Sequence, residues 1–246
     1  MNMMQADDIL ERVSGLANEL KLARLHPQIV ACRNLLTANQ GIDVAVLGRF
    51  KAGKSSFLNH LTGQNILPIG VVPLTAVITR LRYGPEVSVE VRFLNGGTKN
   101  IPPSEIGLYV SEDENPDNQK QVASVVVELP ALQPFAPLEF VDTPGLDSVF
   151  AHNTETTFQW LPNTGAALVA VSCDAPLSER DLELLDALHQ HTPKIVLLLT
   201  KADLLTEAQR AEVRRFVSKQ LQAKGIMELP VFFYSIRPEC ADLKSP

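Results

Sequence analysis

The stretch that decides the fold is Gly48-Arg49-Phe50-Lys51-Ala52-Gly53-Lys54-Ser55, which reads G-x-x-x-x-G-K-S. It follows the apolar run at residues 44–47 and precedes a helical pattern at residues 56–61. A strand, a glycine-rich loop and a helix in this order are the setting of a P-loop, whose backbone N–H groups and helix N-terminus surround an anion. The stretch therefore predicts a binding site for a nucleoside triphosphate.

Two side chains of this P-loop, residues 48–55, have expected roles of their own. Lys54 is expected to span the β- and γ-phosphates, and the Ser55 hydroxyl is expected to coordinate Mg²⁺. The other residues of this region predicted to contact the nucleotide are Gly48, Lys51, Ala52, Gly53 and Ser56.

Length and composition favour a globular protein. The 246 residues, of which 45% are hydrophobic, suffice for one α/β domain with a small appendage. No apolar run reaches the roughly 18 residues of a membrane span, and the N-terminus lacks the order of a signal peptide, so the cytoplasm is the expected location. The net charge of −6 argues against a nucleic-acid footprint spread over the whole surface and leaves only a local basic patch open, so no nucleic-acid partner is expected.

The cysteines indicate neither a disulfide framework nor a zinc site. Cys32, Cys173 and Cys240 lie far apart and no CxxC pair occurs. They are expected to be small buried apolar residues.

Residues 1–40 precede the first strand and carry helical periodicity in two pieces. Ile9, Val13, Leu16, Leu20 and Leu22 form the first apolar stripe, and Pro27 suits the first turn of a second helix. Two interpretations remain open. The helices either clasp the back of the nucleotide domain or await partner helices from elsewhere.

Residues 41–246 are expected to form the nucleotide domain. Strands alternate with helices in its second half, which predicts an α/β fold with a mostly parallel, doubly wound central sheet and one antiparallel edge strand. Expected strands are 44–47, 77–82, 87–93, 122–129, 138–141, 167–172, 195–200 and 231–235, and expected helices are 56–61, 103–109, 154–161, 178–191 and 207–224. The polar, acidic residues 111–120 are expected to form a mobile solvent loop.

The motif Asp142-Thr143-Pro144-Gly145 closes a buried strand and predicts contacts with the metal ion and the γ-phosphate. Asp142 is expected to hold a water on Mg²⁺, and the Gly145 N–H to reach the γ-phosphate. Thr75 is the favoured threonine for completing the Mg²⁺ coordination, with Thr79 and Thr62 as rivals.

Thr200-Lys201-Ala202-Asp203 closes another buried strand and predicts that the base is guanine. A carboxylate such as Asp203 accepts hydrogen bonds from the guanine N1–H and N2–H₂ groups, whereas adenine offers no such donor pair. The Lys201 stem would cover the base. Further nucleotide contacts are expected from Thr200 and from the following loop at Ser235, Ile236 and Arg237.

Together these motifs resemble the GTPase domain of bacterial dynamin-like proteins over residues 42–237. The resemblance rests on G-R-F-K-A-G-K-S-S-F-L-N-H-L-T-G, I-L-P-I-G-V-V-P-L-T-A-V-I-T-R-L-R-Y-G, F-V-D-T-P-G-L, T-K-A-D and Y-S-I-R. It implies a large GTPase whose nucleotide domain is followed by a helical stalk with a membrane-binding tip. Residues 1–40 would then be bundle-forming helices, the last helix and the stalk would lie beyond Pro246, and the full-length protein would be peripheral to the membrane.

One departure from this family bears on mechanism. Eukaryotic dynamins carry Gln-Ser where this chain has Phe50-Lys51, and that pair orients the attacking water and helps to bind a monovalent cation. The hypothesis is that the Lys51 ammonium replaces this cation and stabilises transition-state charge. The alternative is an exposed lysine that contributes only to affinity. The expected catalytic residues are therefore Lys51, Thr75 and Gly145.

Residues 150–154 could cap a helix, which we favour, or contribute to a dimer face. Together the motifs and the resemblance predict hydrolysis of GTP to GDP and phosphate with Mg²⁺, stimulated by homodimerisation through the nucleotide face and coupled to membrane remodelling in the full-length protein. One alternative is a slow GTP-binding switch that acts through an effector. Another is an assembly GTPase on RNA or the ribosome.

Overall fold

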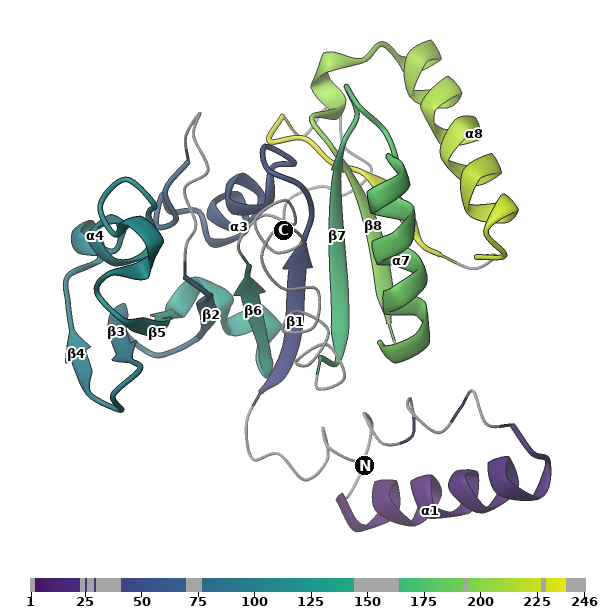
Figure 1. The fold of residues 1–246 in the computed structure, drawn as a ribbon, viewed down its shortest axis with the longest axis horizontal. Coiled ribbons are helices and arrows are strands. Elements are labelled where there is room, and N and C mark those ends of the chain that lie inside the picture. Colours follow the sequence, from purple (N-terminus) through teal and green to yellow (C-terminus); the bar gives the residue numbers. More distant parts are fainter. Residues whose placement is uncertain are drawn as a thin grey trace.

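A single central sheet organises the domain. The computed structural model describes residues 3–22, 25, 29, 41–69, 77–143, 164–192, 194–226 and 229–237. Within these ranges nine strands form one sheet in the order β4-β3-β5-β2-β6-β1-β7-β8-β9 (Figure 1). Their bounds are β1 Ile42–Leu47, β2 Thr79–Tyr83, β3 Ser88–Phe93, β4 Thr98–Asn100, β5 Val122–Leu129, β6 Leu138–Asp142, β7 Ala166–Ser172, β8 Ile195–Thr200 and β9 Val231–Phe233.

The middle and one side of the sheet are parallel. β1 pairs in parallel with β6 and with β7, and β8 continues this arrangement to β9. On the other side β2 pairs antiparallel with β6 but parallel with β5, and β3 is antiparallel to both β5 and β4. The prediction of a mostly parallel sheet with an antiparallel edge is confirmed.

Helices cover both faces of this sheet because its buried strands are apolar at successive positions, and successive side chains point to opposite faces. Val44 and Val46 of β1 belong to one core cluster with Phe57 of α3. Ala45 and Leu47 belong to a second cluster with residues of α7 and α8, on the opposite face. These helices are α3 Lys54–Thr62, α7 Glu179–His191 and α8 Glu207–Ala223.

The segment from 103 to 135 is more ordered than its composition suggests. It holds the 3₁₀ turns Pro103–Glu105, Pro116–Asn118 and Pro130–Phe135 and the short helix α4, Gly107–Val110. The expectation of a solvent loop at residues 111–120 is wrong at its centre, since Asn115 is fully buried. Its amide donates to Tyr109 O at 2.7 Å, and its Oδ1 accepts from Lys120 N at 2.9 Å.

The N-terminal helix α1, Met3–Glu19, lies beyond the amino ends of the central strands, away from the P-loop (Figure 1). Its apolar stripe faces outward: Leu16 is 56% exposed, Ile9 and Val13 are exposed as well, and Leu20, directly after the helix, is 65% exposed. Of the expected second helix, which is predicted to begin at Pro27, only residue 29 is described. No helix in the described ranges has the length and apolar character that crossing a membrane requires.

Cys173 is buried in the second core cluster, as predicted, and burial raises its pKa to about 12. The other two cysteines and the expected helix at 154–161 lie outside the described residues.

Candidate functional site

The P-loop lies between β1 and α3, at the carboxyl end of β1. β6, which ends at Asp142, runs parallel to β1, and β8, which ends at Thr200, runs parallel to β7 and β9. Because the carboxyl ends of parallel strands meet at one edge of a sheet, the predicted phosphate, metal and base motifs share that edge.

The first glycine of the loop is required because the backbone of β7 approaches it too closely for a side chain. Gly48 has φ 148°, and a Cβ there would lie 2.3 Å from the carbonyl oxygen of Ala170 on β7. Gly53, at φ 88°, caps α3 in the left-handed conformation. The two glycines therefore seat the loop tightly against the sheet.

Lys54 is buried at the start of α3. Its ammonium donates to the carbonyl oxygens of Gly48 at 3.0 Å and Arg49 at 3.3 Å. The side chain is thereby folded back over the loop, where it can turn to a phosphate placed within the loop. Ala52, in the loop, is buried, and Ser56, in the first turn of α3, is half-buried.

Ser55 and Asp142 meet across the site. The Ser55 hydroxyl donates to Asp142 Oδ2 at 3.1 Å. Burial raises the pKa of Asp142 to about 6, although the charge of Lys54 and the Ser55 hydrogen bond both act to lower it.

The chemistry of this pair fits Mg²⁺. Asp142 Oδ1 is buried and has no hydrogen-bond partner among the described residues. Mg²⁺ prefers oxygen ligands and keeps several waters. A hydroxyl together with a carboxylate that has one uncommitted oxygen could therefore hold the ion and one of its waters.

The predicted guanine-reading residues lie beside the loop. Thr200 Oγ1 donates to Ala52 O at 2.6 Å, which links β8 to the P-loop. Lys201 adopts φ 56° and its Nζ lies 3.6 Å from Asp174 Oδ2. Asp203 lies in the 3₁₀ turn Ala202–Leu204.

The loop after β9 approaches Asp203. The Ser235 hydroxyl donates to Asp203 Oδ1 at 2.7 Å and accepts from the Arg237 N–H at 2.9 Å. Ile236 is exposed at the tip of this loop. The structure thus brings together Asp203 and Ser235, which the sequence predicted only as members of two separate motifs.

Lys51 lies at the exposed tip of the P-loop with φ 61°. Its Nζ is 5.4 Å from the centroid of the Phe50 ring. The ammonium is thus on the solvent side of the loop and free of the core.

Two predicted catalytic residues, Thr75 and Gly145, lie outside the described residues, as does the segment 150–154. The rivals of Thr75 are both described. Thr62 Oγ1 donates to Leu58 O at 3.0 Å within its own helix, whereas Thr79 is buried in β2 directly opposite Asp142. The Thr62 hydroxyl is therefore turned to the backbone of α3.

Sequence reasoning missed an anchor of the P-loop. Arg49 Nε lies 3.2 Å from Asp181 Oδ2, and Arg49 also donates to Ala175 O at 2.7 Å. Asp181 is buried and forms a capping box with Ser178 at the start of α7. The Ser-x-x-Asp spacing signals the cap, but nothing local signals the arginine.

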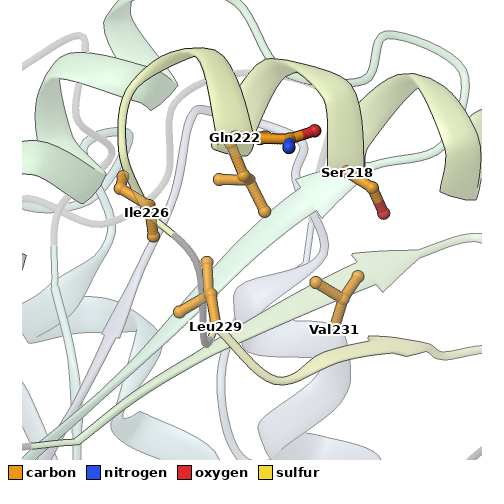
Figure 2. Close-up of a pocket in the computed structure, with 6 residues that line it drawn as sticks. Ser218, Gln222, Ile226, Leu229 and Val231 are labelled. Atoms are coloured by element: carbon orange, nitrogen blue, oxygen red, sulfur yellow. The ribbon is translucent and has the colours of Figure 1, made fainter.

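A pocket of about 290 Å³ lies elsewhere, between α8 and β9 (Figure 2). Val231 in its wall pairs with Leu197, which precedes the carboxyl end of β8. The pocket is therefore set back from the edge that holds the P-loop. It is lined by Ser218, Leu221, Gln222, Ile226, Leu229 and Val231.

Comparison with known proteins gives consistent results. The family model described as Dynamin family matches residues 44–202. An uncharacterized protein from the xynA 3′ region of Caldicellulosiruptor sp. (strain Rt8B.4) is 34% identical over 218 residues, covering 87% of this chain and 54% of that protein. A bacterial dynamin-like protein of Nostoc punctiforme is 37% identical over 166 residues, covering 61% of this chain and 23% of that protein.

A solved structure shares the fold. It belongs to work described as "an oligomerised bacterial dynamin pair provides a mechanism for the long range sensing and tethering of membranes", with a TM-score of 0.65 and 20% identity. The match covers 94% of this chain and 40% of that chain. This chain therefore spans about half, or less, of the length of each of these proteins.

Proposed function

Since the chain belongs to the dynamin family, whose members are GTPases, we propose that it binds GTP with Mg²⁺ at the P-loop edge of the sheet and hydrolyses the β–γ bond. The observation that carries this proposal is the 3.1 Å hydrogen bond from Ser55 to Asp142. It joins the P-loop helix to the end of β6, and so places the two expected Mg²⁺-binding groups side by side. The bound ion would supply charge neutralisation between the β- and γ-phosphates.

Guanine specificity is proposed to come from Asp203. Its carboxylate can accept from both guanine donors, and the Ser235 hydroxyl on its Oδ1 fixes the orientation of the carboxyl plane. Adenine would bring an acceptor to the same carboxylate, and the repulsion would exclude it.

For the chemical step we propose that Lys51 places a fixed charge next to the phosphates. The exposed tip of the P-loop leaves its ammonium able to approach the β–γ bridge from solvent. Phe50 has no hydrogen-bonding side chain, so the attacking water would be oriented by groups near Thr75 and Gly145.

Dimerisation and membrane coupling belong to the same proposal. We propose a homodimer through the nucleotide face, with residues 1–40 as bundle-forming helices next to a GTPase domain at 41–246. The outward stripe on α1 supports the interpretation that these helices await partner helices. In a longer protein that contains this chain, such a bundle would relay nucleotide state to a membrane-bound stalk.

The test is GTP turnover per molecule over about a hundredfold range of protein concentration, in K⁺ and in choline buffer, with ATP as control. We expect turnover that rises with concentration, ignores the cation and requires guanine. Slow turnover at all concentrations with tight GTP binding would instead identify the effector-directed switch. Equal turnover of ATP would overturn the assignment of Asp203.

A further inference from the structure

We propose that Thr79 is a positioning residue of the magnesium site, acting through Asp142. This inference rests on the proposed function, because it concerns the same metal. It assigns a role to a β2 residue that the sequence offered only as a rival for the switch threonine.

Thr79 and Asp142 are direct partners in the antiparallel pair of β2 with β6. Directly opposite residues project from the same face of a sheet, with Cβ atoms about 4.5–5.5 Å apart. Leu81 lies two residues after Thr79 on β2, and Phe140 lies two residues before Asp142 on β6. Both belong to the core cluster that contains Phe57 of α3. The side chains of Thr79 and Asp142 are therefore on the face where α3 brings Ser55.

Both side chains are buried and both have an uncommitted oxygen. Thr79 is 0% exposed and Asp142 is 1% exposed. Within the described ranges, neither Thr79 Oγ1 nor Asp142 Oδ1 has a hydrogen-bond partner. A buried polar atom without a partner destabilises the folded protein, so two of them on directly paired residues are unfavourable unless they serve a ligand.

The two oxygens are complementary. The threonine hydroxyl has a proton to donate, and the carboxylate oxygen can only accept when ionised. The other oxygen of Asp142 is already engaged by Ser55. Thr79 does not bond Asp142 Oδ1 directly in this structure. It is placed to fix this second oxygen through one bridging water, and so to hold the carboxyl plane for a Mg²⁺-bound water.

The fixed position of Thr79 separates this role from that of a switch residue. β2 is paired on both sides, with β5 and with β6, so Thr79 cannot move with the nucleotide state as a switch threonine must. Its contribution would be constant and would act on metal affinity.

The test compares release of a fluorescent GDP from wild type, Thr79→Val and Thr79→Ser, in excess Mg²⁺ and in EDTA. Loss of a residue that orients a metal ligand typically costs 10–100-fold in metal affinity. We therefore expect Thr79→Val to release GDP at least about tenfold faster in Mg²⁺ and at the wild-type rate in EDTA, and Thr79→Ser to stay within about twofold of wild type.

Thr192 supplies a matched control. It is also a buried threonine whose hydroxyl has no partner among the described residues, but it caps the end of α7 before β8 begins. Thr192→Val should leave GDP release unchanged in both buffers. Thermal melts without nucleotide should show both valine variants folded and no less stable than wild type, because each replaces an unpaired hydroxyl with a methyl group.

Three outcomes count against the inference. The inference is overturned if Thr79→Val releases GDP in Mg²⁺ at the wild-type rate. It is also overturned if Thr79→Val releases GDP faster by the same factor in Mg²⁺ and in EDTA, because that result indicates a general packing defect. A wild-type protein whose GDP release ignores Mg²⁺ would overturn the proposed metal site and this inference with it.

Discussion

Thr200 donates a 2.6 Å hydrogen bond to the carbonyl oxygen of Ala52, a residue 148 positions earlier in the chain. The first residue of the guanine motif therefore supports the loop that is expected to hold the phosphates. This contact therefore couples the proposed base-binding end of β8 to the proposed phosphate-binding loop.

Thr200→Val should weaken GDP binding and lower the free energy of unfolding by about 1–3 kcal/mol, because the buried Ala52 carbonyl loses its donor while shape is kept. Thr200→Ser restores the hydroxyl and should recover most of both. The measurements are urea unfolding without nucleotide and GDP titration. Unchanged GDP affinity in the valine variant would show that the contact is irrelevant to binding.

Asp142→Asn should stabilise the metal-free protein at neutral pH. The folded pKa of Asp142, about 6, lies above its ordinary value of 3.8, so its contribution to stability is full below the ordinary value and is lost as pH rises through 6. The difference between these two pKa values corresponds to a change in unfolding free energy of roughly 3 kcal/mol at most.

The check is the difference in unfolding free energy between Asp142→Asn and wild type, measured in EDTA at about pH 4 and about pH 7.5. The advantage of the asparagine variant should appear only at the higher pH. With Mg²⁺ and GDP the order should reverse, because the carboxylate then has its ligand. A pH-independent difference would mean that Asp142 is not the titrating group.

Lys51→Ala should lower GTP turnover by about 10–1,000-fold with GTP affinity kept within a few-fold, if the ammonium stabilises transition-state charge. Lys51→Arg should retain much of the activity, since the charge remains. Single-turnover rates and a separate GTP titration distinguish the two effects. Loss of affinity with an unchanged rate constant would refute the built-in cation and support the alternative role.

Arg49→Ala should destabilise the protein by about 1–3 kcal/mol and weaken nucleotide binding, because it removes the cation from the buried Asp181 and releases the P-loop from α7. Arg49→Lys keeps the charge but not the second hydrogen bond to Ala175, so it should be intermediate. A double-mutant cycle with Asp181→Asn measures the coupling. Additive effects of the two substitutions would indicate that the pair is not energetically linked.

Periodicity predicted the strands well because buried strands of a doubly wound sheet read as continuous apolar runs. The expected strands at 122–129 and 195–200 agree with β5 and β8 at both ends, and the other expected strands agree within about two residues, whereas the short edge strand β4 was not predicted. The P-loop and the two strand-end motifs were likewise visible because each is local in sequence.

Contacts between distant residues could not be predicted in this way. Arg49 and Asp181 meet only because the P-loop and the first turn of α7 share one edge of the sheet. Asn115 was assigned to solvent because its neighbours are polar, yet its side chain replaces the hydrogen bonds that water would have made. The pairing of Thr79 with Asp142 depends on β2 running antiparallel to β6, and a strand's direction leaves no mark in its own sequence.

The outward leucines of α1 have a consequence for any assay that varies protein concentration. Exposed apolar residues on a helix favour association of two copies through that helix. Such pairing would raise turnover with concentration in the same way as the proposed pairing through the nucleotide face, so a second-order rise in turnover would not by itself identify the surface in contact. Leu16→Glu with Leu20→Glu should abolish association through α1, as light scattering would show without nucleotide, and should leave any GTP-dependent pairing intact. Kinetics recorded on that charged variant would report on the nucleotide face alone.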